Sequence, residues 1–546
     1  MKTLKIIILA VLIVMLPCGA LAQASASSQA PASSFKVGAA KLDVTPGQGG
    51  AGDRGGGMGG MPGRGGAAGA TPGGAPTNPA RAAVPAGAIA PAGGTPGAGG
   101  RAGGMGGGMP GGMGGARGDA NDVGRGGAAT GGRGGMGGGR GGRGGIPSEG
   151  ILDHIFARAI VIDNGTTRAA LVSVDTGAIQ DQLWRTVSQR IEQELGIPAQ
   201  NLMMNPTHTH SASGGNAEQI FNVIKAAVDK LQPARIGYGT GVSYINVQRD
   251  IISPKTHNWW EGANYDGPSD KTVAVIKFET LTGEPIAVYF NYACHAVVTG
   301  NTDMLSGDWP GETERYIEDS FDDKCVALFS TGAQGDQNPI YFQQTFDLRE
   351  IRIKDYAARG QDISNQMPSG GTGLNKQDPT VKKLLDQQKM MIKSMGQMMG
   401  EEVKRAMRLM DPNYMSTSGK IVATQKMLSL PGRTRTSGNQ RAGVEATYRD
   451  GPDCSLRLSL LMIDDIALGG GSAEIYNMIA VRFKRESPIG RSIFVSMANG
   501  SSSTGYIPDD AAYGRQSFEV LSARCKPGYA ETGIVNGLLD LIAEVK

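Results

Sequence analysis

The chain has 546 residues, and 85 of them are glycines, many of which lie in one stretch. Length alone would allow two or three average domains, so it overstates the part that can fold. The formal net charge is +3 and aromatic residues make up 5% of the chain. These values argue against a strongly basic nucleic-acid-binding surface and against an aromatic-rich membrane surface.

The N-terminus has the pattern of a secretory signal peptide. Lys2 and Lys5 precede the apolar run 6–16, and the small-residue site Ala20-Leu21-Ala22 follows it. The run is shorter than the roughly 20 residues that cross a bilayer, and no later segment is long and apolar enough. We therefore predict a signal peptide over 1–22, a leader over 23–34, no transmembrane segment and a secreted or periplasmic location.

Four cysteines follow the signal peptide, and they contain no C-x-x-C pair. Four cysteines allow three pairings, so the sequence predicts no particular disulfide. Cys294 is expected to pack as a small buried residue beside His295.

Residues 47–146 consist mainly of Gly, Ala, Pro and Met with scattered arginines. Such a segment has too few large apolar side chains to offset the entropy of ordering, so we predict a disordered insertion. Its Gly-Arg-Gly-Gly repeats are also typical of RNA-binding tails, but the signal peptide argues against a nucleic-acid partner. Attachment to a surface or cell wall is the remaining alternative.

Outside the insertion, strand and helix patterns alternate from residue 151 to the end, after a first strand over 35–46. This alternation predicts a layered α/β (α+β) fold in which central β-sheets are covered by helices. Further strands are predicted at 156–163, 168–175, 272–278, 285–292, 326–329, 456–463 and 466–468, and helices at 183–195, 382–410 and 533–545.

Two of the five histidines, His208 and His210, follow the short apolar run 202–204 and so lie at a strand end. Alternation along an extended backbone would point both to the same side, where one can bind a metal and the other a ligand or water. A His-x-His pair is also found in purely structural roles, so a packed pair is the alternative.

His295 ends the apolar strand 286–294, where an imidazole needs a partner such as a metal or a hydrogen-bonding group. Two turn-rich stretches follow, at 305–311 and 330–339. Asp308 is predicted to be a helix N-cap ahead of Pro310. Asp336 and Asn338 are predicted to make turns.

The motifs Thr-His-Thr-His-Ser, Ala-Cys-His, Ser-Gly-Asp-Trp-Pro-Gly and Gly-Asp-Gln-Asn-Pro occur in the order found in the neutral/alkaline non-lysosomal ceramidase family. The chain resembles the catalytic domain of that family over 35–546, interrupted by the glycine-rich insertion. The resemblance implies the fold of that domain. It also implies that the family's immunoglobulin-like C-terminal domain is missing, because the chain ends where the catalytic domain would end.

The resemblance further implies one Zn²⁺, which the family holds with two histidines, a glutamate and a tyrosine. The matching residues here are His208, His295, Glu474 and Tyr506. Imidazole, carboxylate and phenolate are all acceptable zinc ligands, and an open position can bind water or a carbonyl oxygen. Glu474 could instead be a carboxylate at a helix start, and Tyr506 a packed aromatic residue.

Around the metal, the resemblance assigns His210, Arg249 and Tyr513 to orienting the scissile amide and stabilising its oxyanion. Asn338 occupies the position of a family serine, which excludes a seryl nucleophile there, and Phe518 replaces a family tyrosine. Both changes alter what contacts a substrate in the pocket while leaving the zinc ligands intact.

The sequence therefore predicts a zinc hydrolase that cleaves an N-acyl amide by metal-activated water. The substrate is expected to be a small molecule or a lipid, with ceramide as one candidate, and a lipid substrate is compatible with transient contact with a membrane surface. One alternative is hydrolysis of an ester or a glycan-linked acyl group. Another is a non-catalytic, zinc-containing secreted binding module. No pattern indicates an oligomeric state.

Overall fold

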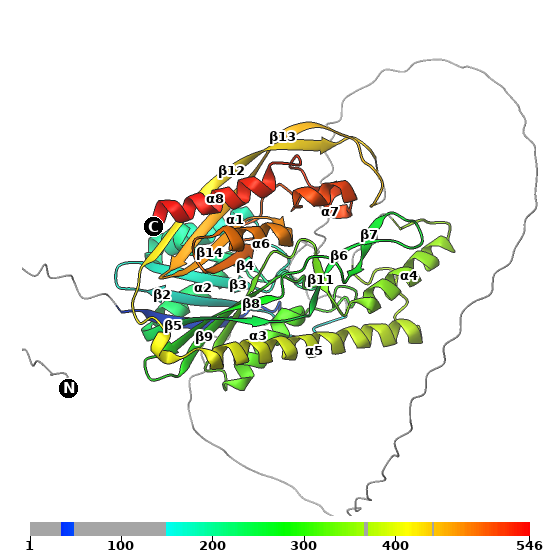
Figure 1. Cartoon of the computed structure of the whole chain (residues 1–546). Helices are drawn as coiled ribbons and strands as arrows, with labels where there is room; N and C mark the ends of the chain where they lie inside the picture. The colour runs from blue at the N-terminus through cyan, green and yellow to red at the C-terminus, as the bar shows by residue number, and fades with distance from the viewer. Residues whose placement is uncertain (1–33, 48–148, 365–369, 439–441) are drawn as a thin grey trace, which may run out of the picture. The chain divides into compact units, whose positions relative to one another are not determined.

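A computed structural model describes residues 34–47, 149–364, 370–438 and 442–546 (Figure 1). The predicted signal peptide 1–22, the leader 23–34 except Ser34, and the insertion 47–146 except Gly47 lie outside the described residues. None of the helices in the described part has the length and apolar character needed to span a membrane.

The larger sheet has eight strands in the order β10-β9-β8-β5-β1-β2-β3-β4. Neighbouring strands are antiparallel except for the pairs β9/β10 and β3/β4, which are parallel. The strands are β1 (Lys36–Asp43), β2 (Phe156–Asp163), β3 (Arg168–Val174), β4 (Leu202–Pro206), β5 (Gln232–Val242), β8 (Thr272–Thr280), β9 (Pro285–Tyr292) and β10 (Val326–Thr331).

A second sheet of four strands packs face to face against the first. Its order is β12-β13-β14-β16. Side chains such as Leu461 and Leu468 share one apolar cluster with Ile160, Leu171 and Ile276 of the larger sheet. The four strands are β12 (Ile421–Arg435), β13 (Tyr448–Ile463), β14 (Ile466–Gly471) and β16 (Arg491–Ser496).

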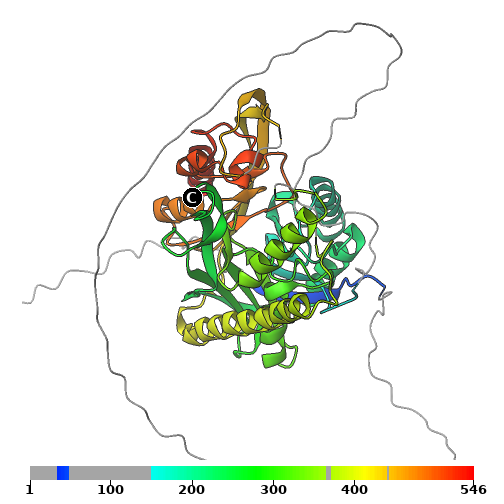
Figure 2. The same cartoon turned by 90° about the vertical axis from the view of Figure 1, so that its right-hand side faces the viewer.

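Helices cover the outer faces of both sheets, as Figures 1 and 2 show. Helices α1 (Asp181–Leu195) and α2 (Ala217–Asp229) pack on β1–β4, and α3 (Asp308–Ser320) and α5 (Pro379–Leu409) pack on β8–β10. On the other side, α6 (Asn477–Glu486) and α8 (Ala530–Val545) cover the second sheet. The predicted layered α/β fold is confirmed. The methionine-rich face of α5 belongs to the core.

Short elements at one end of the sheets carry most of the candidate site residues. One group is the three-stranded sheet β11-β6-β7, and another is the parallel pair β15/β17. Their bounds, with those of two short helices, are β6 (Asn246–Ile252), β7 (Trp259–Asn264), β11 (Gln337–Pro339), β15 (Glu474–Ile475), β17 (Tyr506–Ile507), α4 (Gln343–Ala357) and α7 (Phe518–Ser522).

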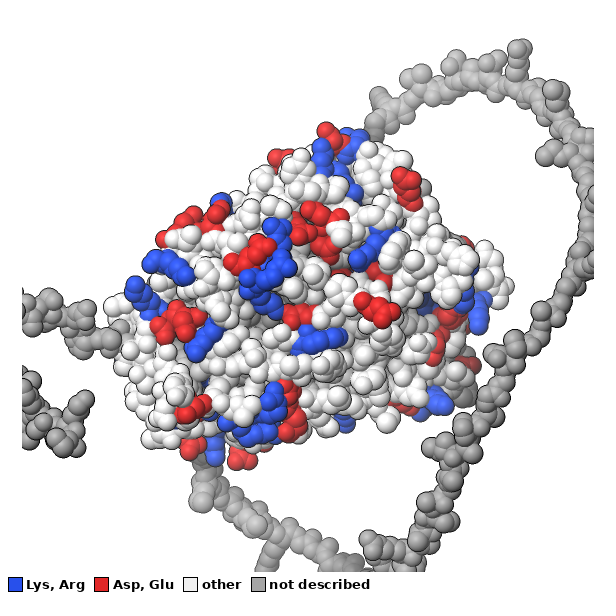
Figure 3. Space-filling view, viewed as in Figure 1, with Lys and Arg blue, Asp and Glu red and all other residues white. Residues whose placement is uncertain are grey.

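Acidic and basic side chains are interspersed on the face seen in Figure 3, in keeping with the small net charge. Most ion pairs of the described residues are on the surface, but a few lie inside, and the largest buried group surrounds Arg158. Arg158 on β2 is 1% exposed and pairs with Glu314 at 2.8 Å and Glu318 at 2.9 Å, both on α3. Asp175 lies 3.6 Å from the same guanidinium. Burial raises the pKa of Glu314 to about 8, although Arg158 opposes the shift.

We predict that Arg158→Met lowers the free energy of unfolding by about 3–5 kcal/mol at neutral pH, because it leaves buried carboxylates without a counter-charge. The loss should shrink at pH 5. Without Arg158 the folded-state pKa values of the carboxyls rise further, so the folded variant binds more protons than the unfolded chain and gains stability as pH falls. Urea denaturation at both pH values measures this. Arg185→Ala, at the exposed helix pair with Asp181, should change stability little, and an equal loss in both variants would contradict the prediction.

Candidate metal centre

His208 and His210 lie on the loop that follows β4. The first residue of this loop, Thr207, donates a backbone hydrogen bond of 2.9 Å to Val174 O at the end of β3. His208 has a φ of 62°, which is uncommon for a residue with a side chain. The backbone is therefore not extended there, and the expectation that alternation alone would align the two rings is wrong. The rings nevertheless meet, with 3.4 Å between their Nε2 atoms.

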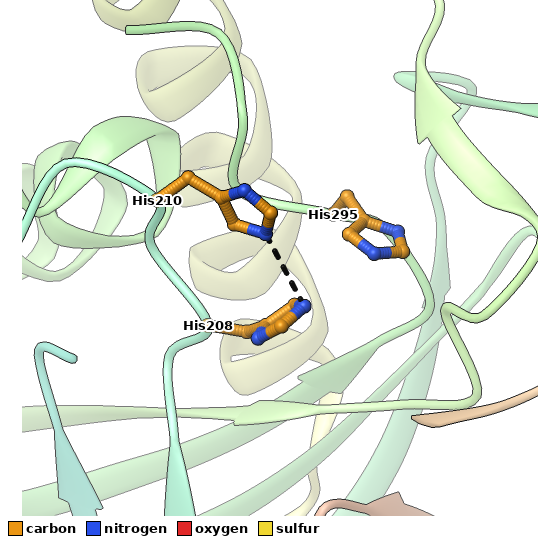
Figure 4. Close-up of side chains that lie close together, drawn as sticks. All are labelled: His208, His210 and His295. Atoms are coloured by element: carbon orange, nitrogen blue, oxygen red, sulfur yellow. Dashed lines mark hydrogen bonds between the residues drawn. The ribbon is translucent and has the colours of Figure 1, made fainter. Parts of the chain in front are cut away.

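Three imidazoles converge at this place: His208, His210 and His295 (Figure 4). One ring nitrogen from each lies within 4.8 Å of the others. His295 follows β9 and is fully buried, His208 is 5% exposed, and His210 is exposed. The predicted strand-end positions of the histidines thus bring them together.

Backbone carbonyls orient the two buried rings. Nδ1 of His208 lies 2.6 Å from the carbonyl of Gly177, and Nδ1 of His295 lies 3.0 Å from that of Gln337. Because a carbonyl only accepts, each Nδ1 carries the proton and donates it. This assignment leaves the lone pair of each neutral Nε2 directed at the centre, as in metal-binding histidines.

Glu474 on β15 completes this arrangement. Its Oε2 lies 3.3 Å from Nε2 of His208 and 3.4 Å from Nε2 of His295. Tetrahedral zinc with ligand distances of about 2.0–2.1 Å separates its ligand atoms by about 3.3–3.4 Å. Burial raises the pKa of Glu474, but attraction to His208 and His295 outweighs it and leaves the pKa well below its usual range.

The same electrostatics favours a positive charge at the centre. Burial lowers the pKa of His208, but Glu474 outweighs burial and raises it. Burial, followed by the charge of Arg249, lowers the pKa of His295 to about 4. A proton on His208 or a bound cation would satisfy the carboxylate, and the donor set of two imidazoles and a carboxylate fits Zn²⁺.

Tyr506 lies beside Glu474. Strand β17 runs parallel to β15 with Tyr506 paired to Glu474, and the phenol ring is 8% exposed. Burial, and then the charge of Glu474, raise the pKa of Tyr506 well above its usual range. Its ring also packs edge-on against Phe518, with centroids 5.6 Å apart. Tyr506 is thus both a packed aromatic residue and a neighbour of the carboxylate.

Arg249 on β6 is 3% exposed and approaches the same region. Its Nη1 donates to Oδ1 of Asn338 at 3.1 Å, and its Nε lies 2.6 Å from Oε1 of Glu519. Asn338 is not a free turn residue, because it pairs with Val247 in β11/β6. Its Nδ2 donates to Glu261 at 3.0 Å.

Sequence reasoning did not single out Glu261 or Glu519. Each is an isolated acidic residue in a short element, and a single sequence shows nothing that separates it from a surface carboxylate. The one available signal for Glu519 is its position next to Phe518 within a mostly apolar stretch.

Tyr513 makes its contacts elsewhere. Its hydroxyl donates to the carbonyl of Cys525 at 3.2 Å, and its ring lies 4.9 Å from the guanidinium carbon of Arg433. Its catalytic role stays a prediction.

Asp308 is not the N-cap of α3. Gly307 holds that position, and Asp308 begins the helix with a φ of 55°. Its carboxylate accepts from the backbone N–H and hydroxyl of Thr299 at 2.8 and 2.6 Å. The hydroxyl of Thr299 lies 2.8 Å from that of Ser211, next to His210.

The adjacent Trp309 is fully buried and donates from Nε1 to the carbonyl of His295 at 2.9 Å. The start of α3 thereby joins the two loops that carry the histidines. This is the physical role of the Ser-Gly-Asp-Trp-Pro-Gly motif. Asp336 does lie in a turn, where its Oδ1 accepts from the backbone N–H of Asn477 at 2.9 Å.

Comparison with known proteins shows which chains and folds this protein is similar to. Residues 144–225 match the profile of the family described as neutral/alkaline non-lysosomal ceramidase, N-terminal. The resemblance to neutral ceramidases is confirmed. The neutral ceramidase of Drosophila pseudoobscura pseudoobscura is 29% identical over 223 residues, which are 35% of this chain and 32% of that protein. The neutral ceramidase of Pseudomonas aeruginosa is 26% identical over 249 residues, 39% of this chain and 37% of that one.

The matched region spans about a third of the length of these curated relatives. A crystal structure of neutral ceramidase from Pseudomonas aeruginosa superposes with a TM-score of 0.54 at 17% identity, covering 73% of this chain and 70% of that chain. The structural likeness extends well beyond the aligned sequence and shows a common fold.

We predict that Asp308→Ala weakens zinc binding by about 10-fold, because groups that hold metal ligands in place typically contribute that much to affinity. Competition with a chromophoric chelator measures the dissociation constant. Asp322→Ala is the matched control, since Asp322 also has a positive φ, of 51°, but is exposed and far from the histidines in the sequence. Equal affinities of Asp308→Ala and the parent chain would count against the role given to the motif.

Proposed function

We propose that the chain is a zinc-dependent hydrolase that uses water to cleave an N-acyl amide bond in a small-molecule or lipid substrate. One observation carries the proposal: Oε2 of Glu474 lies 3.3 Å from Nε2 of His208 and 3.4 Å from Nε2 of His295, the separation of two ligand atoms on one zinc ion. The likeness to neutral ceramidases supports the bond class. Ceramide is one candidate substrate.

The proposed ligands are His208, His295, Glu474 and Tyr506, rather than the three histidines alone. Glu474 lies 3.3–3.4 Å from both buried imidazoles. His210 approaches only His208 closely, and its ring centroid is 6.0 Å from that of His295. His210 is therefore left as a group beside the metal.

Bound zinc would supply Lewis acidity, which lowers the pKa of water and polarises a carbonyl. Although His210 as a whole is exposed, its ring lies against the other two imidazoles (Figure 4), and desolvation there, followed by the charges of His208 and His295, lowers its pKa well below its usual value. His210 is thus neutral at pH 7 and can accept a proton or a hydrogen bond from the reacting groups. Arg249 contributes a fixed positive charge near the oxyanion that forms. Asn338 has no hydroxyl with which to form an acyl-enzyme.

We further propose that the enzyme acts outside the cytoplasm, as a secreted or periplasmic protein. The support is the charged, apolar and small-residue pattern of the predicted signal peptide over 1–22.

The variants Glu474→Gln and His210→Asn distinguish a proposed metal ligand, Glu474, from a group that lies beside the metal, His210. Glu474→Gln is expected to weaken zinc binding more than about 100-fold, beyond the loss typical of supporting groups, and to abolish turnover. His210→Asn should keep one zinc per chain and lower kcat by about 10²–10⁴-fold, the usual contribution of a general acid or base. Metal analysis and steady-state kinetics of both variants measure this. Loss of zinc from His210→Asn with retention in Glu474→Gln would reverse the assignment.

The function itself is tested on a panel of ceramides, N-acyl amino acids, simple esters and acylated glycans, with and without a chelator. We expect chelator-sensitive cleavage of at least one N-acyl amide, restored by added Zn²⁺. Preferential cleavage of the esters or glycan-linked acyl groups would replace the proposed bond class. Tight zinc binding without any cleavage would indicate a binding module instead.

A further inference from the structure

Arg249 carries a full charge in a place that is almost closed to solvent. Its side chain is 3% exposed, and a guanidinium stays protonated at any ordinary pH. Such a charge is costly unless an opposite charge and hydrogen-bond acceptors surround it. The groups that neutralise and hydrogen-bond the Arg249 guanidinium therefore determine the direction of its remaining N–H groups.

Two hydrogen-bond acceptors and one opposite charge hold the guanidinium along its edges. Nε lies 2.6 Å from Oε1 of Glu519, Nη1 donates to Asn338, and Nη2 donates to the carbonyl of Gly335 at 2.7 Å. Gly335 can come this close because it packs on Ile475, where a Cβ would lie 2.9 Å from the backbone carbonyl. Each terminal nitrogen donates one N–H to these acceptors, so the second N–H of each stays available.

Glu519 is the only carboxylate among the described residues that is paired directly with Arg249. It is 1% exposed and lies on α7, 270 positions further along the chain. Glu261, the other carboxylate whose charge acts on Arg249, is paired with Arg349 at 3.2 Å, and Asp250 is paired with Arg515 at 3.0 Å, so both charges are already compensated. Burial raises the pKa of Glu519 to about 8, and the charge of Arg249 opposes that shift. Glu519 is therefore the carboxylate that can serve Arg249 as its direct counter-charge.

The residue before Glu519 reinforces the same contact. The ring of Phe518 lies 4.9 Å from the guanidinium carbon of Arg249 and packs edge-on against Tyr506. The Arg249 guanidinium carbon is itself 5.5 Å from the Tyr506 ring. Two successive residues of α7 thus hold the Arg249 guanidinium next to Tyr506. Phe518 packs against it, and Glu519 provides the opposite charge.

We propose that Glu519 is a positioning residue, which through its ion pair fixes the orientation of the Arg249 guanidinium and directs the free N–H groups toward the reacting amide. The catalytic part of this inference rests on the proposed function. Glu519 does not contact substrate. It acts only through Arg249, so its removal should matter only while Arg249 is present.

A double-mutant cycle tests this, with Glu519→Gln, Arg249→Met and both changes together. We expect Glu519→Gln to lower kcat at least tenfold on the N-acyl amide that the parent cleaves best, to change KM less than threefold and to keep one zinc per chain. In the Arg249→Met background, Glu519→Gln should cause no further loss of kcat. Independent losses that multiply, or full kcat in Glu519→Gln, would overturn the proposal. Glu544→Gln, an exposed carboxylate on α8, is the matched control and should leave kcat unchanged.

Denaturation of the same four proteins provides a readout that needs no activity. Each single change leaves one buried charge unpaired, so the double variant should be more stable than Glu519→Gln alone. If the parent cleaves none of the amides, the proposed function fails, and this comparison still decides whether the pair exists. A double variant no more stable than Glu519→Gln would overturn the pairing.

Discussion

The site depends on one electrostatic constraint: a carboxylate oxygen of Glu474 is held 3.3–3.4 Å from the Nε2 atoms of two buried imidazoles, His208 and His295. The lone pairs of the imidazoles and the negative carboxylate oxygen repel one another at this distance unless a proton or a cation lies between them. The raised pKa of His208 and the lowered pKa of Glu474 are two expressions of that constraint. The surrounding structure keeps the two Nε2 atoms and the carboxylate oxygen from moving apart.

That task is divided among distant parts of the chain. His208 follows β4, His295 follows β9, and Glu474 follows β14, so packing the two sheets together also assembles the ligands. Carbonyls of Gly177 and Gln337 set the ring tautomers, and the start of α3 joins the histidine loops. Because these contacts involve the backbone or buried side chains, they restrict the movement of the ligand side chains. Such restriction is the condition for electrostatic preorganisation.

The sequence was sufficient for the layers of the fold and for the residues that meet at the centre. Period-2 runs located β2, β3, β8 and β9, and the histidines stood at strand ends. It was insufficient where contacts depend on tertiary structure. No local pattern predicts the positive φ of His208. None connects the segments joined by the hydrogen bond from Thr299 to Asp308 or by the pairing of Arg249 with Glu519. The strand predicted at 456–463 begins earlier, at Tyr448, because Gly451, which with Pro452 favours a turn, instead pairs with Gly432 beside a register shift in β12.

The most direct test of the zinc assignment is X-ray absorption at the zinc edge of the Zn²⁺-loaded full-length chain. The account predicts a first shell of only nitrogen and oxygen at about 2.0–2.1 Å, with outer-shell scattering from two imidazoles. A sulfur shell at about 2.3 Å would place the metal at a cysteine, and a spectrum without imidazole scattering would place it away from His208 and His295. Either result would contradict the central claim.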